Sequence, residues 1–122
     1  MDILLDTHIL LWHVADDPRL SLVQSALIAN PQHRKFVSVA SLWEIAIKTG
    51  TGKLTAIGPL DKLVPTSISI LPVQLSHLLR LQTLPYHHRD PFDRLLIAQA
   101  LAENLAVISV DKHFAAYGVA LL

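Results

Sequence analysis

The sequence contains no cysteine, which excludes disulfide bonds and metal sites built from thiolates. It also lacks an uninterrupted apolar run of the roughly 18 residues that a membrane-spanning helix needs. Charged residues, histidines or prolines break every apolar block, so we expect no membrane segment although the mean hydropathy is +0.43. The chain does not open on a basic segment followed by an apolar stretch and a cleavage site. We therefore expect no signal peptide and a cytoplasmic protein.

Net charge is absent as well, because ten basic residues match ten acidic residues when the histidines are neutral. Proteins that bind nucleic acid usually carry an excess of basic residues, so such contact here would come from a local patch. Charged residues make up 16% of the chain and hydrophobic residues 52%, a balance that excludes a disordered chain. The 122 residues can build one hydrophobic core, and we expect a single domain over 1–122.

Strand-like segments alternate with segments of helical periodicity. The clearest helix start is Asp90-Pro91, where the aspartate suits the N-cap and the proline suits the first helical position. The alternation predicts an α/β fold in three layers, with a central, mostly parallel sheet and helices on both faces. The predicted strands are 1–5, 35–39, 67–71, 105–110 and 119–122, and the predicted helices are 7–15, 21–30, 40–49, 60–64, 74–81, 92–104 and 111–116.

Four acidic residues stand at or near the starts of predicted helices: Asp6, Glu44, Asp93 and Asp111. Because ligands bind beyond the carboxyl ends of parallel strands, we expect these side chains along that edge of the sheet. Carboxylates gathered there would repel one another without a cation. Oxygen ligands with no cysteine and no HExxH spacing suit Mg²⁺ or Mn²⁺ better than Zn²⁺. Such ions activate water in phosphodiester hydrolysis, so the acids indicate a metal-dependent nuclease.

Helix capping explains each acid equally well when it is taken alone. Asp6 suits the N-cap of the helix that follows it. Ser41 and Glu44 match a capping box, and Asp90 and Asp93 have the same spacing. Acids in a first turn also complement the helix dipole. Capping does not explain why all of these acids should face one edge, and both interpretations stay open at this point.

Four segments resemble the acidic motifs of PIN domains, in the order of that family and over the whole chain. Residues 4–8 (LLDTH) resemble the opening motif. The second, third and fourth motifs are similar to 37–45 (VSVASLWEI), 90–100 (DPFDRLLIAQA) and 107–114 (VISVDKHF). Within the family, the chain is most similar to the VapC-like branch of toxin–antitoxin ribonucleases.

The resemblance implies an endoribonuclease that depends on Mg²⁺ or Mn²⁺. It implies Asp6, Glu44 and Asp93 as the core metal ligands. Asp111 would support a second metal position or a bound water. Asp90 matches a variant of the motif with two aspartates three residues apart; we assign Asp93 to the metal because it is in register with the apolar residues that follow, and Asp90 to the cap. The supporting hydroxyl groups that the resemblance implies are those of Thr7 and Ser109.

The resemblance also implies an RNA substrate, a homodimer, and a cognate antitoxin whose peptide occupies the active-site groove. The loop at 87–89 is a short basic patch beside the third acidic segment, and Lys48 lies one turn beyond Glu44. We expect RNA contacts from Lys48, His88 and Arg89, with ordinary solvated side chains as the alternative.

Two other classes of α/β protein use acids with Mg²⁺. A receiver domain would need an acidic pair after the first strand and an aspartate at a strand end near mid-chain. A phosphatase of the Asp-x-Asp kind would need an acid at position 8, where the chain has His8. Both classes are disfavoured. The alternative that stays open is a PIN-like module that binds RNA or a partner without cleaving RNA.

Overall fold

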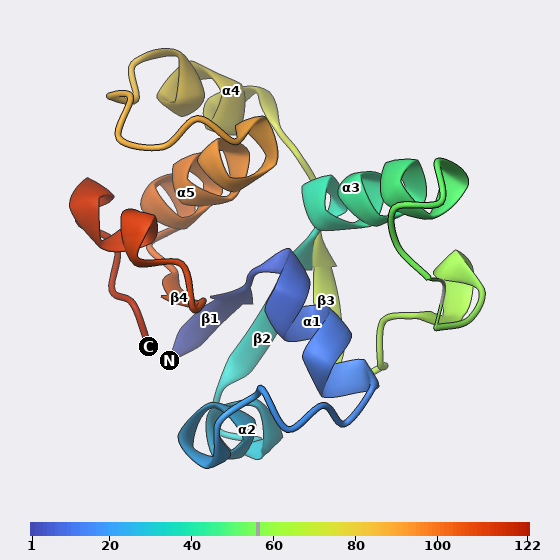
Figure 1. Ribbon diagram of the computed structural model, residues 1–122. Helices are drawn as coiled ribbons and strands as arrows, with labels where there is room; N and C mark the ends of the chain where they lie inside the picture. Colours follow the sequence, from blue (N-terminus) through green and yellow to red (C-terminus); the bar gives the residue numbers. More distant parts are fainter. Residues whose placement is uncertain (56) are drawn as a thin grey trace.

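The computed structural model describes residues 1–55 and 57–122, and Figure 1 shows a central sheet with helices packed around it. The sheet has four strands in the order β3-β2-β1-β4, and every neighbouring pair is parallel. The predicted α/β fold with a parallel sheet is confirmed. The strands are β1 (Asp2–Leu5), β2 (Arg34–Ser38), β3 (Ile68–Leu71) and β4 (Ala106–Ile108).

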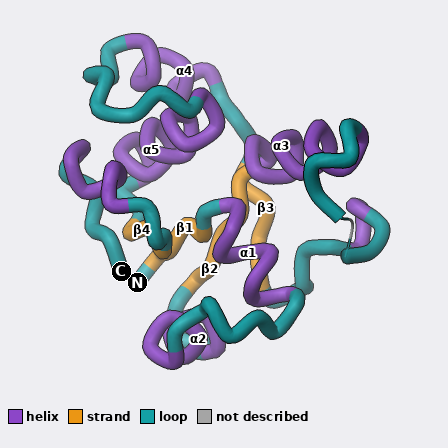
Figure 2. Tube along the Cα trace, viewed as in Figure 1, coloured by secondary structure: helices purple, strands orange, loops and turns teal. Residues whose placement is uncertain are grey.

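The helices form the outer layers, as the colouring by secondary structure in Figure 2 makes clear. Two short 3₁₀ helices are also present: η1 lies between α3 and β3, and η2 follows β4. Among the described residues, no helix has the length and apolar character that crossing a bilayer requires. The helical elements are α1 (Thr7–Val14), α2 (Leu22–Ala29), α3 (Val39–Gly50), η1 (Leu60–Lys62), α4 (Leu75–Gln82), α5 (Pro91–Glu103) and η2 (Lys112–Tyr117).

The central strand β1 divides the core into two halves, because successive side chains of a strand point to opposite faces of the sheet. Ile3 and Leu5 pack with Ile9 of α1 on one face. Leu4 packs with Leu96 of α5 on the other face. All of these side chains are fully buried. Helices cover both faces of the sheet, which accounts for the excess of apolar residues in the sequence.

The predicted last strand, 119–122, is wrong as a strand. The segment makes a single bridge between Val107 and Leu121, with Val107 N–H donating to Ala120 O at 2.8 Å. Strand β4 also ends at Ile108, two residues before the predicted end, because the chain turns there toward η2. Asp111 N–H donates to Ser109 Oγ at 3.0 Å in this turn. The other predicted elements differ from the observed ones by one or two residues at their ends.

Candidate active site

The parallel sheet brings the ends of β1, β2 and β4 to one edge. Asp6 follows β1 directly, α3 begins directly after β2, and Ser109 follows β4 directly. Asp6 N–H donates to Ile108 O at 3.2 Å, so the ends of β1 and β4 are held side by side. Residues that lie far apart in the sequence therefore meet where each strand passes into a helix or turn, as expected for a doubly covered parallel sheet.

Asp6 is both a helix cap and a member of this edge. Its Oδ1 accepts the N–H of Ile9 at 2.9 Å and so caps α1. Its Oδ2 accepts the hydroxyl of Ser109. Burial raises the pKa of Asp6, the hydrogen bonds from Ser109 and Ile9 oppose that rise, and the charge of Asp111 adds to it. The two interpretations of Asp6 are compatible, because a carboxylate has two oxygens.

Glu44 is buried in α3, and it is not part of a capping box. The N-cap of α3 is Ser38, whose Oγ accepts Ala40 N–H at 3.0 Å, so the predicted cap at Ser41 is wrong. Glu44 therefore lies in the second turn, and the whole residue is only 3% exposed. Its Oε1 lies 2.8 Å from Thr7 Oγ1, which donates to it. Its Oε2 lies 2.7 Å from the Nζ of Lys48.

The pKa of Asp93 is influenced by the charges of the other acids. Asp90 caps α5 as predicted, since its Oδ1 accepts the N–H of Phe92 at 2.8 Å and of Asp93 at 3.1 Å. Burial, followed by the charge of Asp90, raises the pKa of Asp93 to about 7. The charges of Asp6 and Glu44 also raise this pKa. Asp93 is therefore within reach of the charges of Asp6 at the end of β1, Glu44 in α3 and Asp90 at the N-cap of its own helix.

Asp111 caps η2, and two histidines surround its carboxylate. Its Oδ1 accepts His113 N–H at 2.9 Å and lies 2.8 Å from His113 Nδ1. Its Oδ2 lies 2.8 Å from His88 Nε2. Burial acts to raise the pKa of Asp111, but the hydrogen bonds from His113 and His88 outweigh burial and lower it. Ser109 links this acid to Asp6, because its Oγ donates to Asp6 and accepts Asp111 N–H.

His88 joins two of the acids, which sequence reasoning missed. Its Nε2 lies 3.0 Å from Asp93 Oδ2 and 2.8 Å from Asp111 Oδ2. Sequence reasoning also missed His113. Among the described residues, His88, Asp111 and His113 offer one ligand atom each within 4.8 Å of one another. The sequence carries no periodic signal for these contacts, because they depend on the path of the loop before α5.

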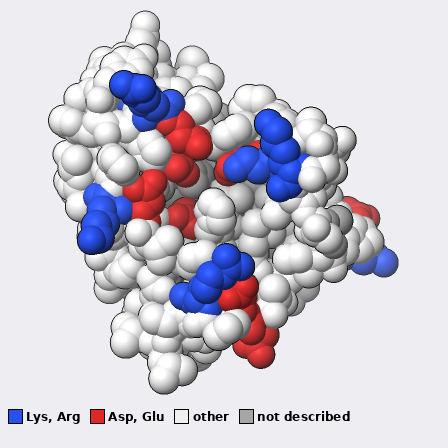
Figure 3. Space-filling view, in the orientation of Figure 1, with Lys and Arg blue, Asp and Glu red and all other residues white. Residues whose placement is uncertain are grey.

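The remaining predicted residues lie around this edge. Thr7 and Ser109 are buried and hydrogen-bonded to Glu44 and Asp6, as a supporting role requires. The side chain of Lys48 is 39% exposed beside Glu44. Arg89 is exposed. Figure 3 shows acidic side chains in a hollow of this face, with lysine and arginine side chains around it.

The donor set fits a divalent cation. Its buried members, Asp6 and Glu44, are only 4% and 3% exposed, and they come from segments that the sheet brings together. Burial, and after it the charges of Asp90, Asp6 and Glu44, raises the pKa of Asp93, so the ionised forms of these acids disfavour one another. Carboxylate oxygens are the ligands that Mg²⁺ and Mn²⁺ prefer. A divalent cation among them would relieve the repulsion.

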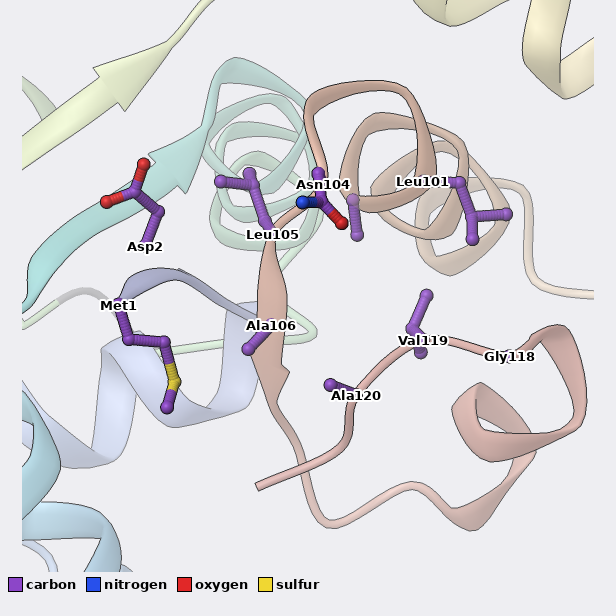
Figure 4. Close-up of a pocket in the computed structure, with 10 residues that line it drawn as sticks. Met1, Asp2, Leu101, Asn104, Leu105, Ala106, Gly118, Val119 and Ala120 are labelled. Carbon is purple, nitrogen blue, oxygen red and sulfur yellow. The ribbon is translucent and has the colours of Figure 1, made fainter.

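A second hollow lies at the opposite end of the sheet and offers no such chemistry. Figure 4 shows it between Met1 and Asp2 at the start of β1 and the segments around Ala106 and Ala120. The only carboxylate among its lining residues is that of Asp2, which is paired with Arg34. The edge that carries Asp6 is therefore the better candidate for an active site.

Comparisons with known proteins support the resemblance seen in the sequence. A family model described as PIN domain matches residues 3–120. No curated protein sequence matches the chain. Among solved structures, the chain is similar to one in a complex of VapBC2 from Rickettsia felis with a promoter DNA fragment. The TM-score is 0.74 at 16% identity, over 100% of this chain and 98% of that chain.

Two further structures show the same fold. One is a DNA-bound VapBC from Salmonella typhimurium, with a TM-score of 0.75 at 15% identity over 100% of this chain and 97% of that chain. The other is FitAcB from Neisseria gonorrhoeae, with a TM-score of 0.68 at 18% identity over 98% of this chain and 96% of that chain. At these identities, the likeness supports a shared fold.

Proposed function

The chain belongs to the PIN domain family, and on this premise we propose that it is an endoribonuclease that depends on Mg²⁺ or Mn²⁺. The observation that carries the proposal is that Asp6 and Glu44, which follow β1 and β2 at one edge of the sheet, lie near enough to Asp93 for their charges to raise its pKa. Two of these carboxylates are almost completely buried, and the third has a pKa raised by burial and then by its acidic neighbours. Helix caps alone do not require such an arrangement, because Glu44 caps nothing.

Each residue has a proposed part in hydrolysis of an RNA phosphodiester. Asp6, Glu44 and Asp93 would hold the cation, and Asp111 would support a second cation or a bound water. A bound divalent cation supplies a polarised water for attack on phosphorus and neutralises charge that develops on the phosphate. The protein residues would orient these groups, and among the residues that the structure describes, no nucleophilic side chain with an adjacent base indicates a covalent intermediate.

The rim of the site fits a polyanionic substrate. Lys48 and the exposed Arg89 flank the acids from α3 and from the loop before α5, and we propose that they contact RNA phosphates. Lys48 also pairs with Glu44, so it would hold this carboxylate in place until a cation binds. A local rim of this kind explains how a chain without net charge would bind RNA.

We further propose that the protein is the toxin of a type II toxin–antitoxin system, acting in the cytoplasm as one domain with a cognate antitoxin. The similar structures named above are toxin–antitoxin complexes. Exposed apolar side chains on α3 and α4 supply surface for a homodimer or for the antitoxin. They include Trp43, Ile47, Leu75 and Leu79, which are 57%, 42%, 70% and 57% exposed.

The test of nuclease function is cleavage of a structured RNA by the purified chain with Mg²⁺ or Mn²⁺. We expect cleavage by the wild type, loss of cleavage with EDTA, and loss in Asp93→Asn. Asp61→Asn is the matched control, because Asp61 is exposed in η1 and lies outside the acidic edge. Equal cleavage by the wild type and Asp93→Asn would overturn the assignment. RNA binding without cleavage would favour the alternative of a non-catalytic binding module.

A further inference from the structure

The imidazole of His88 has one defined hydrogen-bonding pattern. Its Nδ1 accepts the N–H of Asp90 at 3.2 Å. A nitrogen that accepts a hydrogen bond carries no hydrogen, so the ring hydrogen is on Nε2. The Nε2–H donates to Asp111 Oδ2 at 2.8 Å, and Nε2 also lies 3.0 Å from Asp93 Oδ2. The backbone N–H of Asp90, the N-cap residue of α5, thus determines that Nε2 is the ring nitrogen that faces the acids.

The ring is held in this position from several sides. The backbone N–H of His88 donates to Tyr117 Oη at 2.8 Å. The same hydroxyl lies 3.3 Å from Nη1 of the buried Arg94, which also donates to Pro85 O at 2.8 Å. The edge of the His88 ring meets Phe114 at 6.4 Å between centroids. Only 14% of the His88 side chain is exposed, so the surrounding protein fixes the position of the ring.

We propose that His88 is a positioning residue for the divalent cation: it holds Asp111 by donating its Nε2 hydrogen to that carboxylate, and it keeps Asp93 beside the same nitrogen. The inference rests on the proposed function, since the cation is what the two acids would serve. Carboxylates that ligate metals are themselves held by hydrogen bonds, and losing such a partner typically weakens metal binding by about 10–100-fold. His88 supplies one such hydrogen bond to Asp111, and the same nitrogen contacts Asp93, an acid from another segment of the chain.

Direct ligation by His88 is the main rival. His88, Asp111 and His113 have ligand atoms close enough to surround one ion. Ligation through Nε2 would need a lone pair on that nitrogen, so the ring hydrogen would have to move to Nδ1. There it would point at the N–H of Asp90, and two donors would face each other. The contact from Asp90 therefore favours a donor over a ligand.

Contact with RNA is the second rival, and burial argues against it. The Nε2 of His88 already faces two carboxylates, and little of the ring reaches the surface. Arg89, the next residue, is exposed and free of these contacts to the acids, so it is better placed for phosphate.

The experiment compares His88→Gln with His88→Ala in the full chain. Glutamine retains an N–H donor near the position of Nε2, but its nitrogen is not a metal ligand. We measure the Mn²⁺ dissociation constant from the electron paramagnetic resonance signal of free Mn²⁺, and check folding by circular dichroism. We expect His88→Ala to raise the constant about 10–100-fold and His88→Gln to stay within a few-fold of wild type. His87→Ala is the loop control, because the His87 ring packs on Tyr117 and touches none of the acids.

Two results would overturn the proposal. Wild-type affinity in His88→Ala would show that the hydrogen bonds do not position the acids. Equal losses in His88→Gln and His88→Ala would show that the imidazole nitrogen itself binds the metal.

Nitrogen-15 NMR of the histidine rings separates this proposal from the proposed function. The metal-free protein should show the His88 hydrogen on Nε2, and it should stay there after Mg²⁺ is added. A hydrogen on Nδ1 would overturn the positioning role even if the wild type cleaves RNA. A hydrogen on Nε2 in a protein that neither binds Mn²⁺ nor cleaves RNA would support the contact while overturning the nuclease assignment and the role toward a cation.

Discussion

Thr7 Oγ1 lies 2.8 Å from Glu44 Oε1, which joins the first turn of α1 to the second turn of α3. The two residues are 37 positions apart, and both are almost completely buried. Ser41 Oγ lies 2.9 Å from the same Thr7 oxygen, so the hydroxyl is part of a small polar network. Because buried polar atoms need partners, this network holds Glu44 where the other acids can meet it.

Replacing Thr7 by valine should therefore destabilise the fold as well as the site. Valine keeps the shape but leaves Glu44 Oε1 without its donor, and an unsatisfied buried acceptor costs about 1–3 kcal/mol. We expect the free energy of unfolding in urea to fall by that amount. Thr7→Ser, which keeps the hydroxyl, should lie close to wild type. Wild-type stability in Thr7→Val would contradict the prediction, because that variant keeps the methyl group and loses only the hydroxyl.

The raised pKa of Asp93 predicts how the stability of the metal-free protein depends on pH. The folded pKa of about 7 lies above the model value of 3.8, so the folded state holds this proton more tightly than the unfolded chain. The stabilising contribution is complete below pH 3.8 and is lost as pH rises through about 7. Each pKa unit corresponds to about 1.4 kcal/mol, so the loss is on the order of a few kcal/mol.

Asp93→Asn isolates this contribution, because asparagine does not titrate. We expect the variant to gain stability relative to wild type between pH 4 and pH 7, measured by urea unfolding in EDTA. Saturating Mg²⁺ should reverse the order above pH 7, since a ligand that binds only the folded state stabilises it. A constant difference between the two proteins across this pH range would contradict the raised pKa.

Lys48 should affect cation binding and RNA binding in opposite directions. Its ammonium group lies 2.7 Å from Glu44 Oε2 and competes with a divalent cation for this carboxylate. Hydrogen bonding to Glu44, and to a smaller extent the charges of Asp90 and Asp93, raises the pKa of Lys48, so it stays charged at neutral pH. We expect Lys48→Met to bind Mn²⁺ several-fold more tightly and structured RNA several-fold more weakly.

Isothermal titration with Mn²⁺ and filter binding of RNA in EDTA would measure the two effects separately. Lys53→Met serves as the control, because Lys53 lies beyond the end of α3 and away from Glu44. Weaker binding of both Mn²⁺ and RNA in Lys48→Met would instead indicate that the variant distorts α3.

The sequence predicts most of the fold because alternating strands and helices allow few arrangements. It also predicts the N-caps Asp6 and Asp90, since cap residues act within their own helix turn. The capping-box alternative for Glu44 is wrong because Ser38, three residues before Ser41, is the N-cap of α3. The last strand failed for a different reason: 119–122 forms only one bridge to Val107, although its apolar residues suit a strand.

The histidines could not be predicted from local pattern. His88 reaches Asp93 and Asp111 only because the loop at 84–89 takes one path over the start of α5. Arg94 fixes that path by donating to Leu84 O at 3.2 Å and Pro85 O at 2.8 Å. A buried arginine that binds backbone carbonyls produces no periodic pattern in the sequence. The geometry of the loop depends on tertiary structure, so local sequence does not predict it.

Ser109 should control the pH at which the site accepts a cation. Its hydroxyl donates to Asp6 Oδ2 and accepts Asp111 N–H at 3.0 Å. Burial raises the pKa of Asp6, and the hydrogen bond from Ser109 is the largest influence that opposes this rise. Ser109→Ala should therefore raise this pKa further. Because a carboxyl group must lose its proton to ligate a metal, Mn²⁺ binding should then require a higher pH.

Mn²⁺ dissociation constants measured from pH 5 to pH 9 would test this. For Ser109→Ala, we expect the curve of affinity against pH to shift to higher pH. At the alkaline end, the affinity should approach that of wild type. Ser109→Thr keeps the hydroxyl and should follow wild type. An equal loss of affinity at every pH would mean that Ser109 only shapes the turn before Asp111. Convergence at high pH is the specific sign that the hydroxyl acts on the proton of Asp6, since a distorted turn would not recover as pH rises.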